Sequence, residues 1–380
     1  MIYLDAAATS AVRREVLEAM WPYLTGDFGN PSSHHAVGES AARALADARA
    51  VVASWLGCRA SEVVFTSGGT EADNLAIKGV ALATPRGRHI VTTPIEHEAV
   101  LASVEYLTRL HGFEATMVPV GEDGRVDPGA FAEALRPDTT LASVMLANNE
   151  VGTIQPVAEL AALAHERGIP FHTDAVQAAG WLPLDVKALG VDALSVSGHK
   201  LGAPKGIGAL FVRGRIPLEP VVHGGGQERG RRSGTENVAG AVALAAAVRL
   251  SSAAQEANAA AGREARDAFV AAVLREAPGA RLTGHPSERL PASASFVFPG
   301  TNGEAVLLEL ERRGVVSSSG SACAAGSEDA SHVLLALGYP EDLARTAVRF
   351  SWSPDVSAAD LAAVAPAVAD AVREVAALGR

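Results

Sequence analysis

The sequence predicts an α/β fold, with a large domain built on a mainly parallel sheet covered by helices on both faces, plus a smaller α+β domain. From about residue 60 to 215, short apolar runs rich in β-branched residues alternate with alanine-rich segments of helical periodicity. This alternation is typical of βαβ units. A Gly/Arg-rich segment and a long alanine-rich stretch follow it, and the pattern changes after about residue 276. We therefore expect a large domain over residues 14–250 and a small domain formed by residues 1–13 and 251–380.

The elements of the large domain follow from this alternation in order. The run "SEVVFTS" (61–67) predicts a strand, and "GGTEADNLAIKGVALA" (68–83) predicts the helix after it. Pro156 and Gly168 bracket "VAELAALAHER", which gives that helix the usual proline at its start and glycine at its end. Further strands are predicted at "LASVMLA" (141–147), "IPFHTDA" (169–175) and "DALSVSG" (192–198).

The last third of the chain shows a different pattern. A long alanine-rich stretch reaches about residue 276. After it, the sequence predicts a strand at "SASFVFPG" (293–300), a helix at "GEAVLLELERRG" (303–314), a strand at "TAVRFSWS" (346–353) and a terminal helix. A smaller α+β unit is the simplest arrangement of these elements.

Composition argues against several classes of partner. The 380 residues are 48% hydrophobic and 20% charged, as in ordinary globular proteins, and the net charge of −11 opposes nucleic-acid phosphates and anionic membranes. Two cysteines, Cys58 and Cys323, are too few for a disulfide framework. The N-terminus has no basic region followed by an apolar stretch. We expect a cytoplasmic protein without nucleic-acid or membrane partners.

The turn after the first predicted strand is a candidate anion site. In "TSGGTEADN", Gly69 and Thr70 stand where a helix begins. Backbone N–H groups point outward there, and glycine lets an anion approach them closely. An ordinary strand-to-helix turn explains the same residues equally well. Neither G-x-x-x-x-G-K-[ST] nor G-x-G-x-x-G occurs, so a nucleotide-binding protein lacks its main motifs.

Polar residues also follow the later strands, at the edge where open α/β sheets bind ligands. Asp174 and Gln177 are three residues apart, so on a turn that begins a helix they share a face. Alone, Asp174 is better explained as an N-cap and Lys200 as a surface residue. A lysine that forms a Schiff base, with a carboxylate for a protonated ring nitrogen, is however the protein's part in pyridoxal phosphate chemistry. Together with the anion-binding turn, the pair favours such a cofactor.

Ten segments in order along the chain resemble the cysteine desulfurases of the NifS/IscS type. They are "YLDAAATS", "FGNPSSHHAVG", "FTSGGTEADNLAI", "IEHEAV", "MLANNEVGTIQP", "HTDAVQAAG", "LSVSGHKLGAPKGIGAL", "GGGQERGRRSGTEN", "SSSGSACAAG" and "VRFSWS". These enzymes belong to the class V aminotransferase group of fold-type I enzymes, which depend on pyridoxal 5'-phosphate. The resemblance implies that fold and an enzyme that converts L-cysteine to L-alanine and an enzyme persulfide.

The resemblance also implies a role for individual residues. Lys200 would carry the cofactor as a Schiff base, Asp174 would bind the ring nitrogen, and Gln177 the ring hydroxyl. His97 would stack on the ring and move protons. The remaining assignments are Gly69, Thr70, Ser197 and His199 for the cofactor and its phosphate, Asn149 and Arg349 for the substrate carboxylate, and Thr235 for the phosphate of the other subunit. The last assignment implies a homodimer.

Cys323 lies in "SSSGSACAAG" (317–326), where the resemblance makes it the nucleophile that takes the sulfur. The thiolate is the reactive form of cysteine, and glycine and serine suit a segment that must reach the ring and then deliver its cargo. This form of the segment resembles the desulfurases of iron–sulfur assembly. It implies transfer to a scaffold protein, on which Cys323 could share a cluster as a ligand, or to another acceptor such as the tRNA thiolation machinery.

Some features depart from the family or leave other functions open. Ala6 stands where the family usually has asparagine, and the chain ends at "AALGR" without the longer tail by which some members dock a scaffold. Alternatives are another class V lyase or transaminase, such as a selenocysteine lyase, and an inactive protein that serves as an assembly platform. Transamination needs no thiol, so Cys323 argues against it. The histidines at 34 and 35 and in "HEAVL" lack metal-binding patterns, so we expect no intrinsic metal.

Overall fold

A seven-stranded sheet forms the centre of the large lobe. The computed structural model describes residues 1–83, 86–277, 279–320 and 330–378. The strand order is β2-β8-β7-β6-β5-β3-β4, and β8 is antiparallel to both neighbours while the other pairs are parallel. The strands are β2 (Val63–Thr66), β3 (His89–Thr92), β4 (Glu114–Met117), β5 (Thr139–Ser143), β6 (Phe171–Asp174), β7 (Ala193–Ser197) and β8 (Gly208–Val212). The mainly parallel sheet predicted from the sequence is confirmed.

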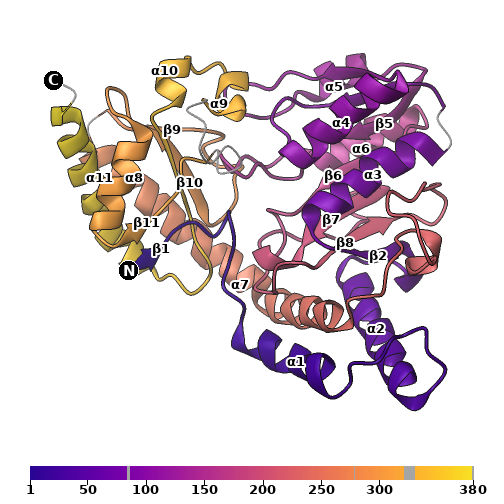
Figure 1. Ribbon diagram of the computed structural model, residues 1–380. Helices are drawn as coiled ribbons and strands as arrows, with labels where there is room; N and C mark the ends of the chain where they lie inside the picture. The colour runs from indigo at the N-terminus through magenta and orange to yellow at the C-terminus, as the bar shows by residue number, and fades with distance from the viewer. Residues whose placement is uncertain (84–85, 278, 321–329, 379–380) are drawn as a thin grey trace.

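Helices cover both faces of this sheet (Figure 1). Side chains alternate along each strand, so Val63 and Phe65 of β2 join one buried cluster while Val64 joins another. On the first face lie α2 (Ala36–Trp55), α5 (Pro128–Ala134), α6 (Val157–Glu166) and the first half of α7 (Val238–Glu276). On the second lie α3 (Gly69–Ala83) and α4 (Glu98–His111).

Helix α7 connects the two lobes (Figure 1). It is 39 residues long, and by length and composition alone it could span a bilayer. Residues such as Leu244 and Val248 of its first half are buried in the large lobe, whereas Phe269 and Val273 belong to the core of the small lobe. The predicted boundary at residue 250 falls inside this continuous helix, and the division into domains stays a prediction.

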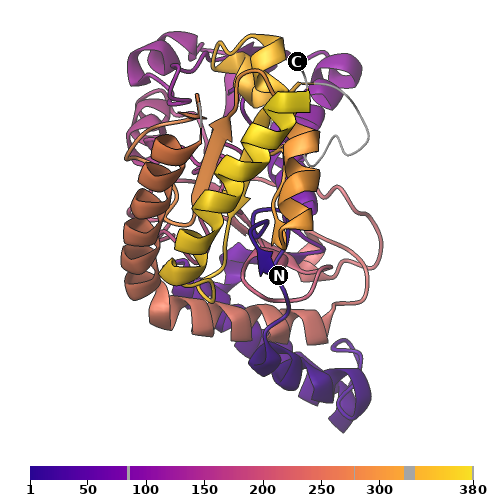
Figure 2. The ribbon, with the colours of Figure 1, turned by 90° about the vertical axis from the view of Figure 1, so that its left-hand side faces the viewer.

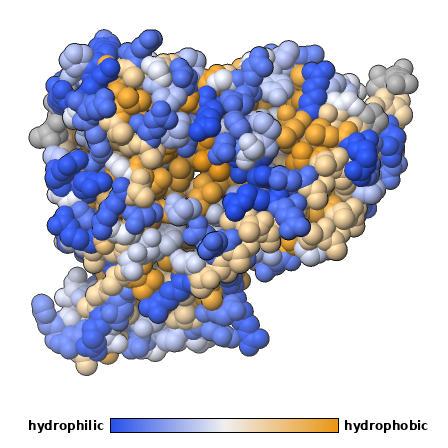
Figure 3. All heavy atoms as spheres, turned by 180° about the vertical axis from the view of Figure 1, so that it is seen from behind, coloured by the Kyte–Doolittle hydropathy of each residue, from blue (hydrophilic) through white to orange (hydrophobic). Residues whose placement is uncertain are grey.

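The small lobe is built on a three-stranded antiparallel sheet in the order β12-β10-β9. Its strands are β9 (Arg281–Leu282), β10 (Ser293–Val297) and β12 (Ala347–Ser351). Figure 2 shows α8 (Gly303–Arg312) and α11 (Ala358–Leu378) side by side in this lobe. Two short helices, α9 (His332–Ala336) and α10 (Glu341–Ala344), lie near the large lobe. From behind, hydrophobic side chains gather where the lobes meet (Figure 3).

The N-terminal segment joins the two lobes a second time. Strand β1 (Ile2–Tyr3) pairs in parallel with β11 (Val315–Val316) of the small lobe. The chain then crosses to the large lobe, where the backbone N–H of Ser10 donates to the carbonyl of His199 at 3.1 Å. It enters α1 (Arg14–Thr25), which packs against α7. Residues 5–10 are thereby held at the carboxyl edge of the large sheet.

Candidate active site

A cavity of about 310 Å³ lies at the carboxyl ends of the large sheet's strands, the position at which open α/β sheets bind ligands. Strands β6 and β7, helix α3 after β2, and the segments after β3 and β5 each supply residues to it. The sequence-predicted residues that line the cavity are Gly69, Thr70, His97, Asn149, Asp174, Gln177, Ser197, His199, Lys200 and Arg349. The structure therefore brings together residues that are up to 280 positions apart in the sequence, since Gly69 and Arg349 both line the wall.

The first turn of α3 forms one end of the cavity. A Cβ added at Gly69 would lie 2.8 Å from Val176 Cγ2, so a larger residue at this position would displace the Val176 side chain. Thr70 follows it, and Ser197, at the end of β7, lies opposite. The start of α3, a 15-residue helix, presents its backbone N–H groups and its positive dipole end here. The donors and the close approach suit a phosphate group.

His199 stands beside this turn. Burial, together with the charges of Lys200 and Lys205, lowers the pKa of His199 to about 4. Its imidazole is therefore neutral at pH 7. One ring nitrogen, Nδ1, lies 3.1 Å from Thr9 Oγ1, a hydroxyl of the N-terminal segment. This contact fixes the orientation of the ring at the edge of the cavity.

Asp174 ends β6 and is buried in the wall of the cavity. Its Oδ1 accepts a hydrogen bond from the backbone N–H of Val176 at 2.8 Å. Burial raises the pKa of Asp174, while His97 and Lys200 oppose this shift by favouring the ionised form. A buried carboxylate facing a cavity is the group needed to bind a protonated ring nitrogen. Gln177, three residues on, donates from Nε2 to the carbonyl of Ala7 at 3.0 Å.

The helix predicted to begin after Asp174 does not form. Residues 175–182 form a series of turns in the structure, with the N–H groups of Ala178 and Ala179 both bonded to the carbonyl of Ala175. Gly180, at φ +82°, occupies the left-handed region and interrupts the helical geometry. Asp174 and Gln177 nevertheless both line the cavity, as the shared face predicted.

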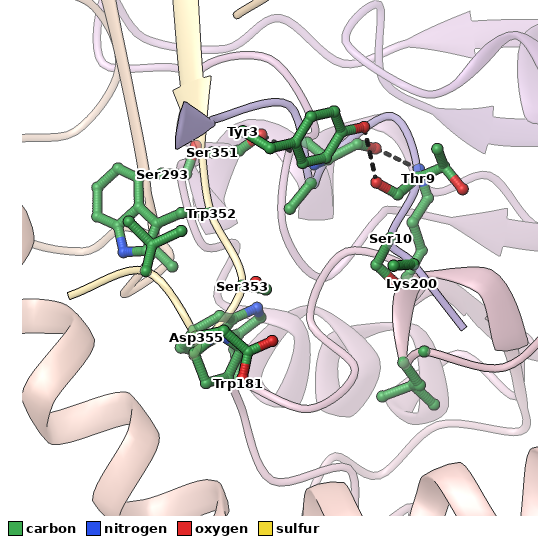
Figure 4. Close-up of a pocket in the computed structure, with 18 of the residues that line it drawn as sticks. Tyr3, Thr9, Ser10, Trp181, Lys200, Ser293, Ser351, Trp352, Ser353 and Asp355 are labelled. Carbon is green, nitrogen blue, oxygen red and sulfur yellow. Dashed lines mark hydrogen bonds between the residues drawn. The ribbon is translucent and has the colours of Figure 1, made fainter. Parts of the chain in front are cut away.

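Lys200 ends the short 3₁₀ turn Gly198–Lys200 that follows β7. Its Nζ donates hydrogen bonds to the carbonyl oxygens of Ala7 and Ala8, the latter at 2.8 Å. Figure 4 shows the lysine beside Thr9 and Ser10 of the N-terminal segment. The ammonium group thus reaches the centre of the site and is held there by backbone carbonyls.

His97 is the N-cap residue of α4. Its Nδ1 accepts a hydrogen bond from the backbone N–H of Ala99 at 3.1 Å. In the neutral ring the proton is therefore on Nε2. This contact fixes the tautomer of the ring, which lines the cavity, and leaves Nε2 as the nitrogen that can donate a proton.

Arg349 of β12 closes the cavity from the small lobe. Its Nη1 donates to the carbonyl of Asn149 at 2.9 Å, and its Nη2 lies 2.7 Å from Asp5 Oδ1. Its Nε is buried and has no hydrogen-bond partner within the described part of the chain. A buried guanidinium with a free donor can bind an anionic group such as a carboxylate.

Two predicted residues are not among those that line this cavity. Thr235 lies in the loop before α7 and is exposed, so it is available to another molecule. Cys323 lies outside the described residues. The described chain before it ends at Gly320, which does line the cavity.

Sequence reasoning missed Asp5, Asp73 and the carbonyls of Ala7 and Ala8. Asp73 lines the cavity from α3, where it is buried. A signal existed, because Asp73 falls on the same helical face as Ala76, Ile77 and Val80, an unusual place for a carboxylate. The carbonyls carried no signal, since any residue supplies one.

A larger cavity of about 650 Å³ adjoins the first one. Both are lined by Ala7, Asn149, Gln177 and Lys200. Figure 4 shows that Trp181, Trp352 and Asp355 lie on the side away from Lys200. The site therefore opens into a wider space between the lobes.

Comparisons with known proteins agree with this geometry. A profile of the family Aminotransferase class-V matches residues 2–364. Cysteine desulfurase IscS of Dictyoglomus turgidum is 46% identical over 351 residues, which cover 92% of this chain and 89% of the relative. The chain belongs to the cysteine desulfurases of the class V aminotransferase family. The sequence-based resemblance is thereby confirmed.

Solved structures of similar proteins support the same fold. A structure described as a NifS-like protein has a TM-score of 0.89 and 35% identity, and the match covers 99% of this chain and 98% of the other. A structure described as SspA in complex with cysteine has a TM-score of 0.82 and 37% identity, over 93% and 99% of the two chains. The predicted fold-type I architecture is confirmed.

Cysteine desulfurases of this family depend on pyridoxal 5'-phosphate. Membership of the family therefore confirms the predicted cofactor. The residues present fit that group. The glycine turn and start of α3 suit its phosphate, the buried Asp174 its ring nitrogen, and Lys200 its aldehyde. Among the described residues, no group of three or more His, Cys, Asp or Glu side chains is arranged to hold a metal ion.

Proposed function

We propose that this chain converts L-cysteine to L-alanine and holds the released sulfur as a persulfide on Cys323. The observation that carries the proposal is the single cavity in which Lys200, Asp174 and His97 meet Arg349 of the small lobe. Relatives named cysteine desulfurase match along almost the whole chain. A similar protein of known structure is described in complex with cysteine, which supports this amino acid as the substrate.

The chain's own residues have separable tasks in this reaction. When bound, pyridoxal phosphate supplies an electron sink that weakens bonds at the substrate's α-carbon. Asp174 holds the ring, and Arg349 orients the substrate through its carboxylate. Lys200 Nζ and His97 Nε2 line the cavity, and we propose that they take up and return protons. None of them is a sulfur nucleophile, so that task falls to a cysteine.

The sulfur transfer balances without an external oxidant. An S–S bond forms between the Cys323 sulfur and the substrate sulfur, and the C–S bond of the substrate breaks. The carbon that loses sulfur gains a proton, which gives alanine, and the enzyme thiol becomes a persulfide. Cys58 cannot replace Cys323, because burial raises the pKa of its thiol to about 12 and keeps it protonated.

We also propose a homodimer and a cytoplasmic location. Support for the dimer comes from an apolar stripe on and beyond α1, formed by Leu17, Trp21, Leu24 and Phe28, each at least half exposed. Leu17, Trp21 and Leu24 share one face of α1, and Phe28 follows shortly after the helix ends. Exposed apolar residues gathered in this way mark an interaction surface. The exposed Thr235 further supports a site completed by a second copy. Sparse cysteine usage supports a reducing compartment.

The sulfur acceptor is proposed to be a protein. An iron–sulfur scaffold is favoured because the "SSSGSACAAG" segment resembles that of desulfurases in cluster assembly. Incubation of ³⁵S-loaded enzyme with purified candidate scaffold and tRNA-thiolation proteins would identify the acceptor. Label transferred only to thiolation proteins would contradict the scaffold proposal.

The first experiment compares purified wild type with Cys323→Ala and the matched control Cys58→Ala. The cofactor absorption spectrum is recorded, and then sulfide and alanine release from L-cysteine is measured with a thiol reductant present. We expect all three proteins to bind cofactor, and Cys323→Ala to lose activity by at least about 100-fold. Sulfide release by Cys323→Ala at the wild-type rate would refute Cys323 as the sulfur carrier.

A further inference from the structure

Asp73 is a buried carboxyl group in the site that none of the tasks above uses. It projects from α3 with 1% of its surface exposed and lines the cavity beside Asp174. Aspartate is almost never fully buried without a partner. Its Oδ1 nevertheless has no hydrogen-bond partner within the described part of the chain. The group therefore needs an explanation.

In the described part of the chain, the groups that act most strongly on the charge of Asp73 are acidic or neutral. Its carboxyl group lies within hydrogen-bonding reach of the Asp174 carboxyl group and the Ser195 hydroxyl, and Glu96 adds a further acidic group nearby. His172 Nε2 is 3.7 Å from Asp73 Oδ1. That imidazole is neutral, because burial lowers the pKa of His172 to about 3.

Both ring nitrogens of His172 lie within hydrogen-bond distance of serine hydroxyl groups. Its Nδ1 lies 2.9 Å from Ser143 Oγ and its Nε2 lies 3.0 Å from Ser195 Oγ. The ring thus links two hydroxyl groups and offers Asp73 no ion pair. Two buried carboxyl groups in contact repel each other when both are ionised, and the cationic groups of the site, Lys200 and His97, act on Asp174. One of the pair, Asp73 or Asp174, must hold a proton.

The surroundings distinguish the two groups. Asp174 receives a backbone N–H from Val176 and faces His97 and Lys200, all of which favour its ionised form. Asp73 is instead faced by the acidic groups of Asp174 and Glu96. Burial and the nearby Asp174 charge raise the pKa of Asp73 well above its usual range. The proton therefore belongs on Asp73.

We propose that Asp73 is a positioning residue that keeps a proton and donates it in a hydrogen bond to the Asp174 carboxylate, which is thereby held ionised toward the cofactor ring nitrogen. The inference rests on the proposed function insofar as it names the cofactor. With Val176 N–H and Asp73 both bonded to it, the Asp174 carboxylate is fixed from two elements, the turn after β6 and helix α3. Asp73 acts through Asp174 and need not touch the substrate.

The proton is tested on the apoprotein, without cofactor or activity. Protein labelled with ¹³C at the aspartate side-chain carboxyl carbon is titrated by NMR, which excludes Glu96 from the spectrum. We expect one aspartate carboxyl signal in wild type to keep its protonated shift at neutral pH, and Asp73→Asn to lose it. Absence of this signal in wild type, or its survival in Asp73→Asn, would overturn the proposal.

The role toward Asp174 is tested by pyridoxal phosphate titration of the apoprotein across pH. Asp73→Asn keeps a donor, and we expect its dissociation constant to stay within about 3-fold of wild type. Asp73→Leu removes the donor while filling the space. We expect binding at least about 10-fold weaker, and weaker still as pH falls, because Asp174 then takes up the proton itself.

Leu75→Ala is the matched control, since it loosens α3 at a buried position that does not line the cavity. It should lower the melting temperature without a pH-dependent change in affinity. Wild-type affinity and pH profile in Asp73→Leu would overturn the role, and so would identical losses in Asp73→Asn and Asp73→Leu. If wild type itself fails to bind pyridoxal phosphate, the proposed function fails, while the NMR experiment still decides where the proton lies.

Discussion

Arg349 and Asp5 form an ion pair across the active site, with Nη2 2.7 Å from Oδ1. The arginine side chain is 2% exposed and the aspartate side chain 19%. The pair joins the small lobe's β12 to the N-terminal segment, whose next residues receive the hydrogen bonds of Lys200 and Gln177. One contact therefore orients Arg349, which we propose binds the substrate carboxylate, and anchors the segment that holds Lys200.

Asp5→Ala should weaken substrate binding more than it slows turnover. Without its partner the Arg349 guanidinium keeps a buried charge but loses its fixed orientation, so KM for L-cysteine should rise several-fold with a smaller change in kcat. The unfolding free energy should fall by about 3 kcal/mol, the usual cost of breaking a buried pair. Steady-state kinetics and urea denaturation measure both. Arg14→Ala, which breaks the exposed Arg14–Glu18 pair, should change stability by less than about 1 kcal/mol.

The buried pair Arg49–Glu228 provides a second stability test. Two hydrogen bonds of 2.6 and 2.8 Å join the guanidinium to the carboxylate, and Glu228 sits at a strained φ of +49°. Glu228→Met should cost about 3–5 kcal/mol, because it leaves Arg49 buried and unpaired. The double variant Arg49→Met with Glu228→Met should recover most of this loss. Additive losses in denaturant unfolding would show that the ion pair itself does not explain the cost.

Glu96 should make stability depend on pH. Burial raises its pKa to about 8 from 4.5, against the opposing hydrogen bonds from Met145 N–H and Thr93; Asp174 and His97 also face it. The folded state thus binds this proton more tightly than the unfolded state. The stability that Glu96 contributes is complete below about pH 4.5 and is lost as pH rises to about 8, at up to about 1.4 kcal/mol per unit.

Glu96→Gln should flatten this dependence between about pH 5 and 8. Urea unfolding at a series of pH values measures the slope, and Glu98→Gln, at an exposed position on α4, is the matched control. An unchanged slope in Glu96→Gln would show that the carboxyl group is already ionised in the folded protein.

The apolar stripe on α1 should mediate self-association. Trp21→Glu places a charge in its centre and should convert the dimer to a monomer in sedimentation experiments, because burying an unpaired carboxylate at an interface is costly. Leu308→Glu, at an exposed position on α8 of the small lobe, is the control. A wild-type monomer, or a Trp21→Glu dimer as stable as wild type, would contradict the proposed interface.

Much of the site could be predicted from the sequence. Lys200, Asp174, His97 and the Gly69–Thr70 turn all follow strands, and the carboxyl ends of parallel strands meet at one edge. Their order along the chain, with the resemblance of ten segments, was sufficient for the fold class, the enzyme class and the cofactor. Asp5 and Asp73 were missed because the sequence around a carboxylate does not show which distant residue it will contact. Arg349 is 344 positions from Asp5, and Asp174 is 101 positions from Asp73.

Local sequence thus determined most helices and strands, through the spacing of apolar residues and the positions of proline and glycine. Residue type determined which chemical groups are available to the site. Tertiary structure alone decided which charges meet. Arg349 pairs with Asp5, Lys200 with the carbonyls of Ala7 and Ala8, and Asp73 shares a buried space with Asp174. The physical reason is that protonation state and hydrogen bonding depend on burial and on neighbours in space, and these exist only after the chain has folded.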